Sequence, residues 1–321
     1  MKYKILSIFI CALFLCSLCG CGQTTSDRYT IAVIAKSTTS DFWQNVLRGV
    51  NAAATEYNIS ITFDGPASEE DYTAQNAMIT AAVARGDDAI VLSAIDYDKS
   101  ADAVNAAVAA GVAVIMIDSD VNSERTSAFI GTDNYEAGYL AGEAASELLA
   151  DKHAGEKAKI GLVNYAPYSA NGQEREAGFR AYIEKYGGEI VDCINAESNT
   201  ESAIAGALSL LEAHPEINVI VGFNEWMTLG IGCAIRELGL SDDVIAIGFD
   251  SNVVSIGMLE TGEMDALMVQ NPFAIGYLGV RSAAELLSGK EIEPQIITST
   301  TVITKDNMFD EENQRILFKF R

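Results

Sequence analysis

Short apolar runs alternate along this chain with longer segments in which apolar residues recur at helical spacing. The first run, residues 30–35, is apolar and β-branched without polar alternation, which is typical of a strand buried on both faces of a parallel sheet. A polar loop follows, and Asp41 is placed to cap a helix that begins with the aromatic pair Phe42 and Trp43. The pattern therefore predicts a strand, a loop and a helix, with two large aromatics at the carboxyl end of the strand.

The same alternation continues to residue 303 in two successive sets. Because strands that alternate with helices are joined by crossovers, each set predicts a parallel sheet with helices on its faces. The fold class is therefore α/β, with two Rossmann-like lobes. The expected strands of the first set are residues 30–35, 59–64, 88–93, 112–117 and 127–131, and those of the second are residues 159–164, 189–195, 219–223, 244–249, 264–269 and 296–303.

The N-terminus has the pattern of an export signal. Lys2 and Lys4 precede an apolar run, residues 5–18, that is short for a membrane-spanning helix. The run ends in Leu18-Cys19-Gly20-Cys21, which resembles the lipobox of bacterial lipoproteins. We expect residues 1–20 to be removed, Cys21 to be acylated and residues 21–28 to form a tether. The alternative is an ordinary signal peptide.

The net charge of the chain indicates which partners it can bind, and its cysteine content indicates whether disulfides hold the fold. The 321 residues include 21 Lys and Arg against 45 Asp and Glu, a net charge of -24 that repels polyanions and argues against nucleic acid. Of the six cysteines, only Cys193 and Cys233 lie beyond the anchor segment. Two cysteines in a body of this size indicate buried thiols rather than a disulfide framework.

Enzyme signatures are absent from the sequence. It contains no phosphate-binding loop, no nucleophile elbow and no pair of histidines at helical spacing, and His153 and His214 fall near predicted helix ends. No cofactor or metal ion is predicted on these grounds.

Polar side chains instead gather where the predicted strands end. Carboxyl ends of parallel strands share one edge of the sheet, which is where α/β proteins bind ligands. Carboxylates and amides bind hydroxyl groups, and aromatic rings such as Phe42 and Trp43 pack on the apolar face of a sugar. The alternative is that these residues only open loops and cap helices. The strand-end residues are Ser93, Asp118, Asn224, Asp250 and Gln270.

These motifs together resemble the type I periplasmic binding proteins of the ribose and galactose class, the solute receptors of sugar ABC transporters. The resemblance extends over residues 29–303. It is carried by Ile31-Ala32-Val33, Asp41-Phe42-Trp43, Val114–Asp118, Gly131-Thr132-Asp133-Asn134, Glu174-Arg175, Phe223-Asn224-Glu225, Ile247–Asp250 and Gln270-Asn271-Pro272.

The resemblance implies two lobes joined by three crossing strands near Gly131, Gln270 and Thr298. The expected lobes are residues 29–131 with 271–298, and residues 132–270 with 299–321. Residues 305–321 have no predicted position within the second lobe. The resemblance also implies that the interlobe pocket is lined by Phe42, Trp43, Asp118, Asn224, Asp250 and Gln270.

The sequence departs from the ribose-binding branch at two positions where that branch has arginine. Ser119 and Gln173 stand there instead, which argues against ribose itself because a bidentate arginine is not replaced by these side chains. Lys36 in the first loop offers a different cation, close to Ser40. Ser93 and Thr132 complete the predicted site.

The resulting prediction is an exported, lipid-anchored and monomeric receptor on the outer face of the bacterial cytoplasmic membrane, or in the periplasm. It would bind a monosaccharide or polyol and deliver it to an ABC permease. One alternative is a signalling receptor of the same fold for a sugar or an autoinducer-like furanose. Another is a glycosidase that uses Asp118 and Asp250. A sugar-responsive repressor would need a DNA-binding segment where the export signal lies.

Overall fold

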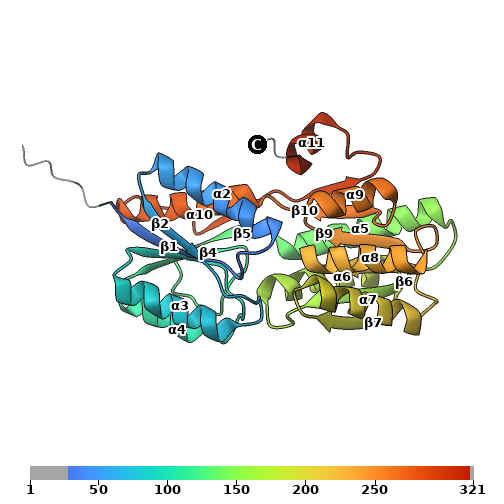
Figure 1. Ribbon diagram of the computed structural model, residues 1–321, viewed down its shortest axis with the longest axis horizontal. Helices are drawn as coiled ribbons and strands as arrows, with labels where there is room; N and C mark the ends of the chain where they lie inside the picture. The colour runs from blue at the N-terminus through green and yellow to red at the C-terminus, as the bar shows by residue number, and fades with distance from the viewer. Residues whose placement is uncertain (1–27, 319–321) are drawn as a thin grey trace, which may run out of the picture.

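The computed structural model describes residues 28–318, which form two α/β lobes lying side by side (Figure 1). Each lobe contains one six-stranded sheet, which confirms the predicted fold class. Residues 1–27, with the predicted signal and Cys21, lie outside the described residues. Among residues 28–318, no helix is both long and apolar enough to cross a membrane.

The first sheet has the strand order β11-β5-β4-β3-β1-β2, and all of its strand pairs are parallel. Its strands are β1 (Thr30–Ile34), β2 (Ser60–Asp64), β3 (Ala89–Leu92), β4 (Ala113–Ile117), β5 (Ala128–Thr132) and β11 (Gln295–Thr298). Its helices are α2 (Asp41–Glu56), α3 (Tyr72–Arg85), α4 (Ala101–Ala109) and α10 (Pro272–Leu287). We call this unit the N-lobe.

The second sheet has the order β12-β10-β9-β8-β6-β7. Its strands are β6 (Lys159–Tyr165), β7 (Glu189–Ala196), β8 (Val219–Gly222), β9 (Ile245–Phe249), β10 (Ala266–Val269) and β12 (Thr301–Thr304). Its helices are α5 (Asn134–Lys152), α6 (Ala170–Tyr186), α7 (Thr200–Ala213), α8 (Glu225–Leu238), α9 (Val253–Thr261) and α11 (Glu311–Leu317). We call this unit the C-lobe.

The chain passes between the lobes three times, after β5, after β10 and between β11 and β12. The expected single extended segment 296–303 is therefore two strands, one in each sheet. β12 pairs antiparallel with β10 because it enters the C-lobe sheet directly, without the helix that a parallel crossover needs. Two side-chain hydrogen bonds tie the crossings together: Thr132 Oγ1 donates to Gln270 Oε1 at 2.8 Å, and Thr298 Oγ1 donates to the Gly131 carbonyl at 3.2 Å.

Helix α10 comes from late in the sequence but packs on α2, the helix that carries the aromatic pair (Figure 1). Two glycines permit this contact. A Cβ on Gly49 would lie 2.0 Å from the Phe273 carbonyl oxygen, and one on Gly276 would lie 2.2 Å from the Val46 carbonyl oxygen. The two backbones therefore meet without intervening side chains, and α10 fixes the direction of α2.

The start of α2 differs in one detail from the expectation. Ser40, not Asp41, is the N-cap: its Oγ accepts a hydrogen bond from the Trp43 backbone N–H at 3.3 Å. Asp41 is the first helical residue, where its carboxylate lies near the positive end of the helix dipole. Both residue types suit this end of a helix, so composition alone does not separate them.

Of the C-terminal residues for which no position was predicted, residues 305–318 form a turn and the short helix α11 of the C-lobe. Leu317 of α11 is buried in the C-lobe core, and Ile316 packs against it. Cys193 and Cys233 are free thiols, each only partly buried.

Candidate functional site

A small cavity lies between the lobes at the carboxyl ends of the strands, and we call it the inner cavity. Its free volume is about 30 Å³, which is room for one or two water molecules. Side chains from both lobes line it. They are Lys36, Ser40, Phe42, Trp43, Glu69 and Asp118 from the N-lobe, and Tyr165, Asn171, Arg175, Asn224, Glu225, Trp226, Asp250 and Gln270 from the C-lobe and the crossing after β10.

Each lobe contributes one aspartate from the same place in its sheet. Asp118 follows β4 and Asp250 follows β9, and their backbone N–H groups donate to Ile130 and Met268 carbonyls on the neighbouring strands. Both have left-handed backbones, with φ of 59° for Asp118 and 68° for Asp250. Non-glycine residues rarely adopt this region outside functional sites and turns. The two carboxylates are therefore equivalent groups presented to one cavity by two similar lobes.

The environment of Asp250 disfavours its charge. The side chain is 8% exposed, and burial raises its pKa to about 6 despite the opposing influence of Arg175. Gln270 Nε2 donates to Asp250 Oδ1 at 2.7 Å, and Thr132 orients the Gln270 amide by donating to its oxygen. The crossings between the lobes thus fix the orientation of a carboxylate that lines the cavity.

The N-lobe wall is an aromatic corner. Phe42 and Trp43 pack edge to face, with ring centroids 5.0 Å apart and an interplanar angle of 89°. Trp43 Nε1 donates to Glu69 Oε1 at 3.1 Å, and Ser37 Oγ donates to the same oxygen at 3.0 Å. Burial raises the pKa of Glu69. The indole is therefore held in one orientation by a carboxylate that itself faces the cavity.

Lys36 reaches from the N-lobe into the C-lobe. Its Nζ donates to Ser169 Oγ at 2.7 Å and to Asn171 Oδ1 at 3.0 Å, and lies 3.8 Å from Asp118 Oδ2. The side chain is 2% exposed, and burial lowers its pKa although Asp118 opposes the shift. The predicted cation of the first loop thus lies at the cavity.

A second cation, Arg175, supports the cavity from the C-lobe. Its Nε donates to Asn134 Oδ1 at 2.9 Å, its Nη1 donates to the Phe223 carbonyl at 2.8 Å, and the guanidinium lies 4.7 Å from the Phe249 ring centroid. It is 1% exposed, and within residues 28–318 its Nη2 has no hydrogen-bond partner. Arg175 lines the cavity, so its Nη2 is a buried donor nitrogen available there.

Three predicted residues lie behind the cavity wall rather than on it. Ser93 Oγ donates to Asp118 Oδ2 at 2.8 Å, Ser119 Oγ lies 3.5 Å from Ser169 Oγ, and Thr132 binds Gln270. All three are buried. The Ser93 and Thr132 hydroxyls bind residues that line the cavity, whereas Ser119 lies next to Ser169, which accepts a hydrogen bond from Lys36.

Gln173 lies apart from the other predicted residues. It is exposed on α6, and its Nε2 donates to the Pro167 carbonyl at 2.7 Å. Asn171 and Arg175, two positions on either side, line the cavity instead. Residues four apart share one face of a helix, and the residue midway between them lies on another. The expectation that Gln173 lines the pocket is therefore wrong.

Six lining residues were not predicted as site residues. Glu225 and Trp226 directly follow Asn224, which was predicted. Their proximity to Asn224 in the sequence could therefore have identified them. Tyr165 is the last residue of β6, so it also lies at a strand end. It was missed because the prediction considered only residues with carboxylate, amide or hydroxymethyl side chains at strand ends. The six are Glu69, Tyr165, Asn171, Arg175, Glu225 and Trp226.

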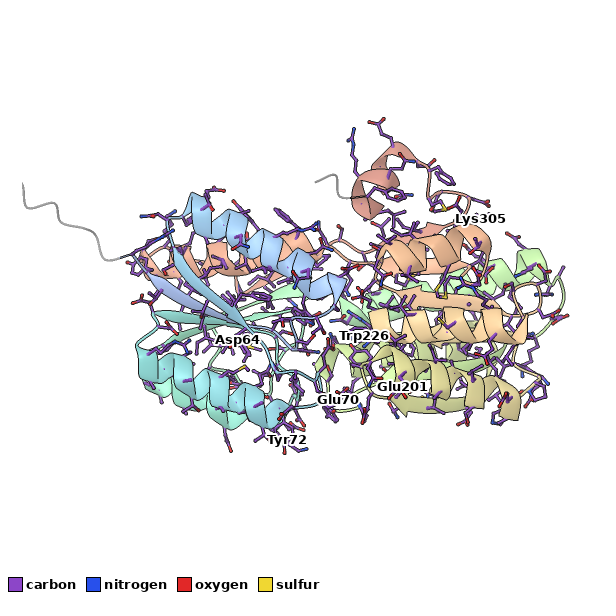
Figure 2. The ribbon with its side chains drawn as sticks, viewed as in Figure 1. Asp64, Glu70, Tyr72, Glu201, Trp226 and Lys305 are labelled. Carbon is purple, nitrogen blue, oxygen red and sulfur yellow. The ribbon has the colours of Figure 1, made fainter. Side chains whose placement is uncertain are left out.

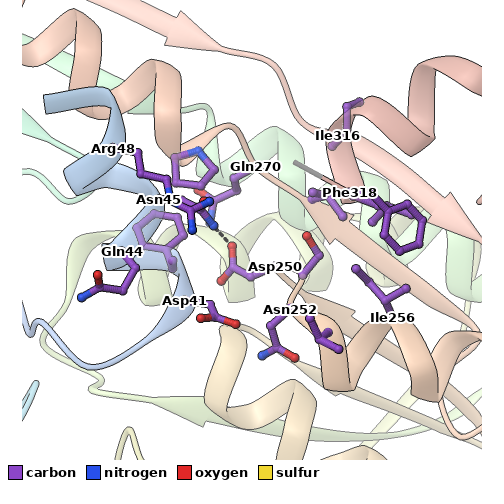
Figure 3. A pocket seen from close by; sticks show the side chains of 16 residues that line it. Asp41, Gln44, Asn45, Arg48, Asp250, Asn252, Ile256, Gln270, Ile316 and Phe318 are labelled. Carbon is purple, nitrogen blue, oxygen red and sulfur yellow. Dashed lines mark hydrogen bonds between the residues drawn. The ribbon is translucent and has the colours of Figure 1, made fainter. Parts of the chain in front are cut away.

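A larger pocket of about 420 Å³ opens beside the inner cavity (Figure 3). It lies between the first turns of α2, the loop before α9 and the end of α11. Phe42, Asp250 and Gln270 line both spaces, so the hydrogen-bonded Gln270 and Asp250 side chains form part of the wall between them (Figure 3).

The comparisons with known proteins agree with this architecture. A solute-binding protein of an ABC transporter from Agrobacterium vitis, solved with bound D-fucose, is 34% identical and superposes with a TM-score of 0.86 over 90% of this chain and 100% of its own. A carbohydrate transporter solute-binding protein from Agrobacterium radiobacter, solved with D-arabinose, is 29% identical with a TM-score of 0.89 over 91% of this chain and 100% of its own. The ribose import binding protein of Bacillus subtilis is 24% identical over 305 residues, which are 92% of this chain and 97% of that protein.

The family model described as periplasmic binding protein domain matches residues 31–291, which span both lobes and all but the last crossing. This match confirms the resemblance found in the sequence motifs. Together with the two-lobed fold and the relatives above, it shows that the chain belongs to the periplasmic binding protein family.

Proposed function

We propose that this protein is an extracytoplasmic receptor that binds one monosaccharide or polyol between its lobes and delivers it to an ABC permease. The observation that carries the proposal is the inner cavity itself, where equivalent aspartates of the two lobes face an aromatic corner. Relatives with this fold have been solved with D-fucose, D-arabinose and D-tagatopyranose.

Each group of the cavity has a role in this proposal. Asp118 and Asp250 accept hydrogen bonds from ligand hydroxyls, and Asn224 and Gln270 exchange hydrogen bonds with them. Lys36 and the free Nη2 of Arg175 donate to ligand oxygens. Trp43 and Phe42 pack against the apolar face of the ring. Ser40 lines the cavity at the start of α2.

Ligand entry requires the lobes to separate. A free volume of about 30 Å³ holds water but not a sugar ring, and the surrounding side chains are hydrogen-bonded across the lobes. A ligand that contacts both lobes then stabilises a closed arrangement whose lining side chains make room for the sugar ring, by its differential affinity for that arrangement. The three crossings, tied by Thr132 and Gln270, are the place where such a hinge motion bends.

The test is a thermal-shift and calorimetry screen of the purified protein from residue 22 onward. D-ribose, D-arabinose, D-fucose, D-allose, D-tagatose and linear polyols form the panel. A ligand at ~100-fold its Kd should raise the stability by about 2.7 kcal/mol. If none shifts the melting temperature, the sugar proposal fails.

The same screen tests whether the protein is an enzyme. A receptor returns its ligand unchanged, whereas a glycosidase built on Asp118 and Asp250 would release reducing sugar from glycosides. We propose that no bond is broken, and chromatography of the recovered ligand after prolonged incubation would reveal turnover.

The membrane anchor and the oligomeric state are further parts of the proposal. Acylation at Cys21 would hold the protein on the outer face of the cytoplasmic membrane, and Cys21→Ser should move the full-length protein from the membrane to the soluble fraction. A monomer is expected, and light scattering of the protein without the anchor would measure it.

A further inference from the structure

Two glutamates, one from each lobe, bind backbone N–H groups of the opposite lobe. The first is Glu225, the first residue of α8 in the C-lobe. Its Oε2 accepts a hydrogen bond from the Phe42 backbone N–H at 3.2 Å, and its Oε1 accepts one from Asn252 Nδ2 at 2.7 Å. Glu225 is 7% exposed. Both carboxylate oxygens are therefore already engaged.

The Phe42 N–H belongs to the first turn of α2, where backbone N–H groups lack partners within the helix. Ser40 satisfies the Trp43 N–H, and Glu225 of the other lobe satisfies the Phe42 N–H. A carboxylate at this end also lies against the positive end of the helix dipole. When the lobes separate, both the N–H and the carboxylate must return to water.

The second glutamate, Glu70, makes the reciprocal contact from the N-lobe. Its Oε1 accepts a hydrogen bond from the Ser198 backbone N–H at 2.7 Å. Glu70 lies in the loop after β2, and Ser198 lies in the loop after β7. β2 and β7 are the edge strands that lie furthest from the crossings in their sheets. The contact therefore joins the two lobes on the side of the cleft opposite the crossings. Figure 2 shows Glu70 where the two lobes face each other.

We propose that Glu225 and Glu70 form a two-part interlobe clasp, which positions the lobes in the closed arrangement and sets how long a bound ligand is held. The clasp acts on backbone N–H groups, so it strengthens the closed state equally for every ligand. Glu225 also lines the inner cavity, but both of its carboxylate oxygens are engaged by protein groups; the other residues of the cavity choose the ligand, and the clasp controls its release. Its effect on release rests on the proposed function, whereas its effect on the closed shape does not.

The decisive experiment therefore uses the protein without ligand. Small-angle X-ray scattering and amide hydrogen exchange are compared for the wild type, Glu225→Ala, Glu70→Ala and the double variant, all from residue 22 onward. Glu237→Ala is the matched control, because it removes an exposed glutamate of the same helix, α8. Circular dichroism verifies that each variant is folded, and Glu225→Gln supplies a neutral side chain of the same shape.

The clasp predicts a larger radius of gyration in the double variant, with each single variant between it and the wild type. Exchange of the Phe42 amide should rise about tenfold in Glu225→Ala, and that of the Ser198 amide in Glu70→Ala, because a hydrogen bond to a charged group is lost. Glu237→Ala should leave both unchanged. Wild-type scattering and exchange in the folded double variant would overturn the proposal.

The kinetic arm uses whichever sugar of the panel shifts the melting temperature. Both tryptophans of the chain, Trp43 and Trp226, line the inner cavity, so their fluorescence reports ligand release in a stopped-flow chase. The release rate should rise about tenfold in each single variant, while the ratio of affinities for two sugars stays the same. A changed ratio would assign Glu225 to ligand contact instead. If no sugar binds, the function proposed above fails and the scattering result still decides the clasp.

Discussion

Asp250 gives a quantitative test of the cavity through the pH dependence of stability. Burial raises its pKa to about 6 in the folded protein, against about 3.9 for an unperturbed aspartate. Between these values the folded state binds more protons than the unfolded state. The contribution of Asp250 to the free energy of unfolding therefore falls as the pH rises from about 4 to about 6. This contribution is fully lost above about pH 7.

The size of this loss follows from the shift in pKa. A difference of about two units corresponds to about 3 kcal/mol at neutral pH, since each unit is worth about 1.4 kcal/mol. Asp250→Asn removes the titrating group and keeps an oxygen that can accept the Gln270 hydrogen bond. The free energy of unfolding of the variant, minus that of the wild type, should therefore increase by about 2 kcal/mol between pH 4 and pH 7.5, because part of the full loss has already occurred at pH 4.

Urea unfolding at a series of pH values, without ligand, measures this difference. Other carboxylates titrate in both proteins and cancel in the comparison. Asp242→Asn, which removes an exposed carboxylate of the same lobe, is the control for the loss of one acidic group. If the pH dependence of Asp250→Asn matched that of this control, the charge of Asp250 would not be destabilised by burial.

Further predictions concern individual residues of the cleft, each measured by calorimetry with the sugar identified in the screen. Trp43→Ala should weaken binding at least about tenfold, because the packing of a sugar ring on the indole contributes about 1.4 kcal/mol or more to the binding free energy. Arg175→Lys should weaken binding and lower the melting temperature, because lysine cannot keep both the Asn134 and Phe223 hydrogen bonds while packing on Phe249. Gln173→Ala should leave the affinity unchanged, and a large loss would return this residue to the site.

The sequence pattern predicted the strands and most strand-end residues well, because buried parallel strands are continuous apolar runs. Asp118 and Asp250 end such runs, and their position at the cavity follows from sheet geometry alone. The same reasoning could not find Glu69. That residue lies in a loop whose path depends on the Trp43 and Ser37 hydrogen bonds it receives.

The error at Gln173 has a different origin. The resemblance placed the site near the start of α6, but only the helix phase decides which residues face the cleft. Asn171 and Arg175 share that face, and Arg175 is buried although it is charged. A buried arginine depends on partners from distant segments, here Asn134 and the Phe223 carbonyl, which local pattern does not reveal.

The packing of α10 on α2 has a consequence for the order of folding. The N-lobe contains the first strands of the chain, yet the helix that covers α2 is residues 272–287 and its edge strand β11 is later still. Contacts of such high sequence separation form slowly, because a long loop must close first. The first lobe to be synthesised is therefore completed only after most of the C-lobe, through β10, has been made, and a nascent chain lacking α10 would keep the apolar face of α2 open to chaperones.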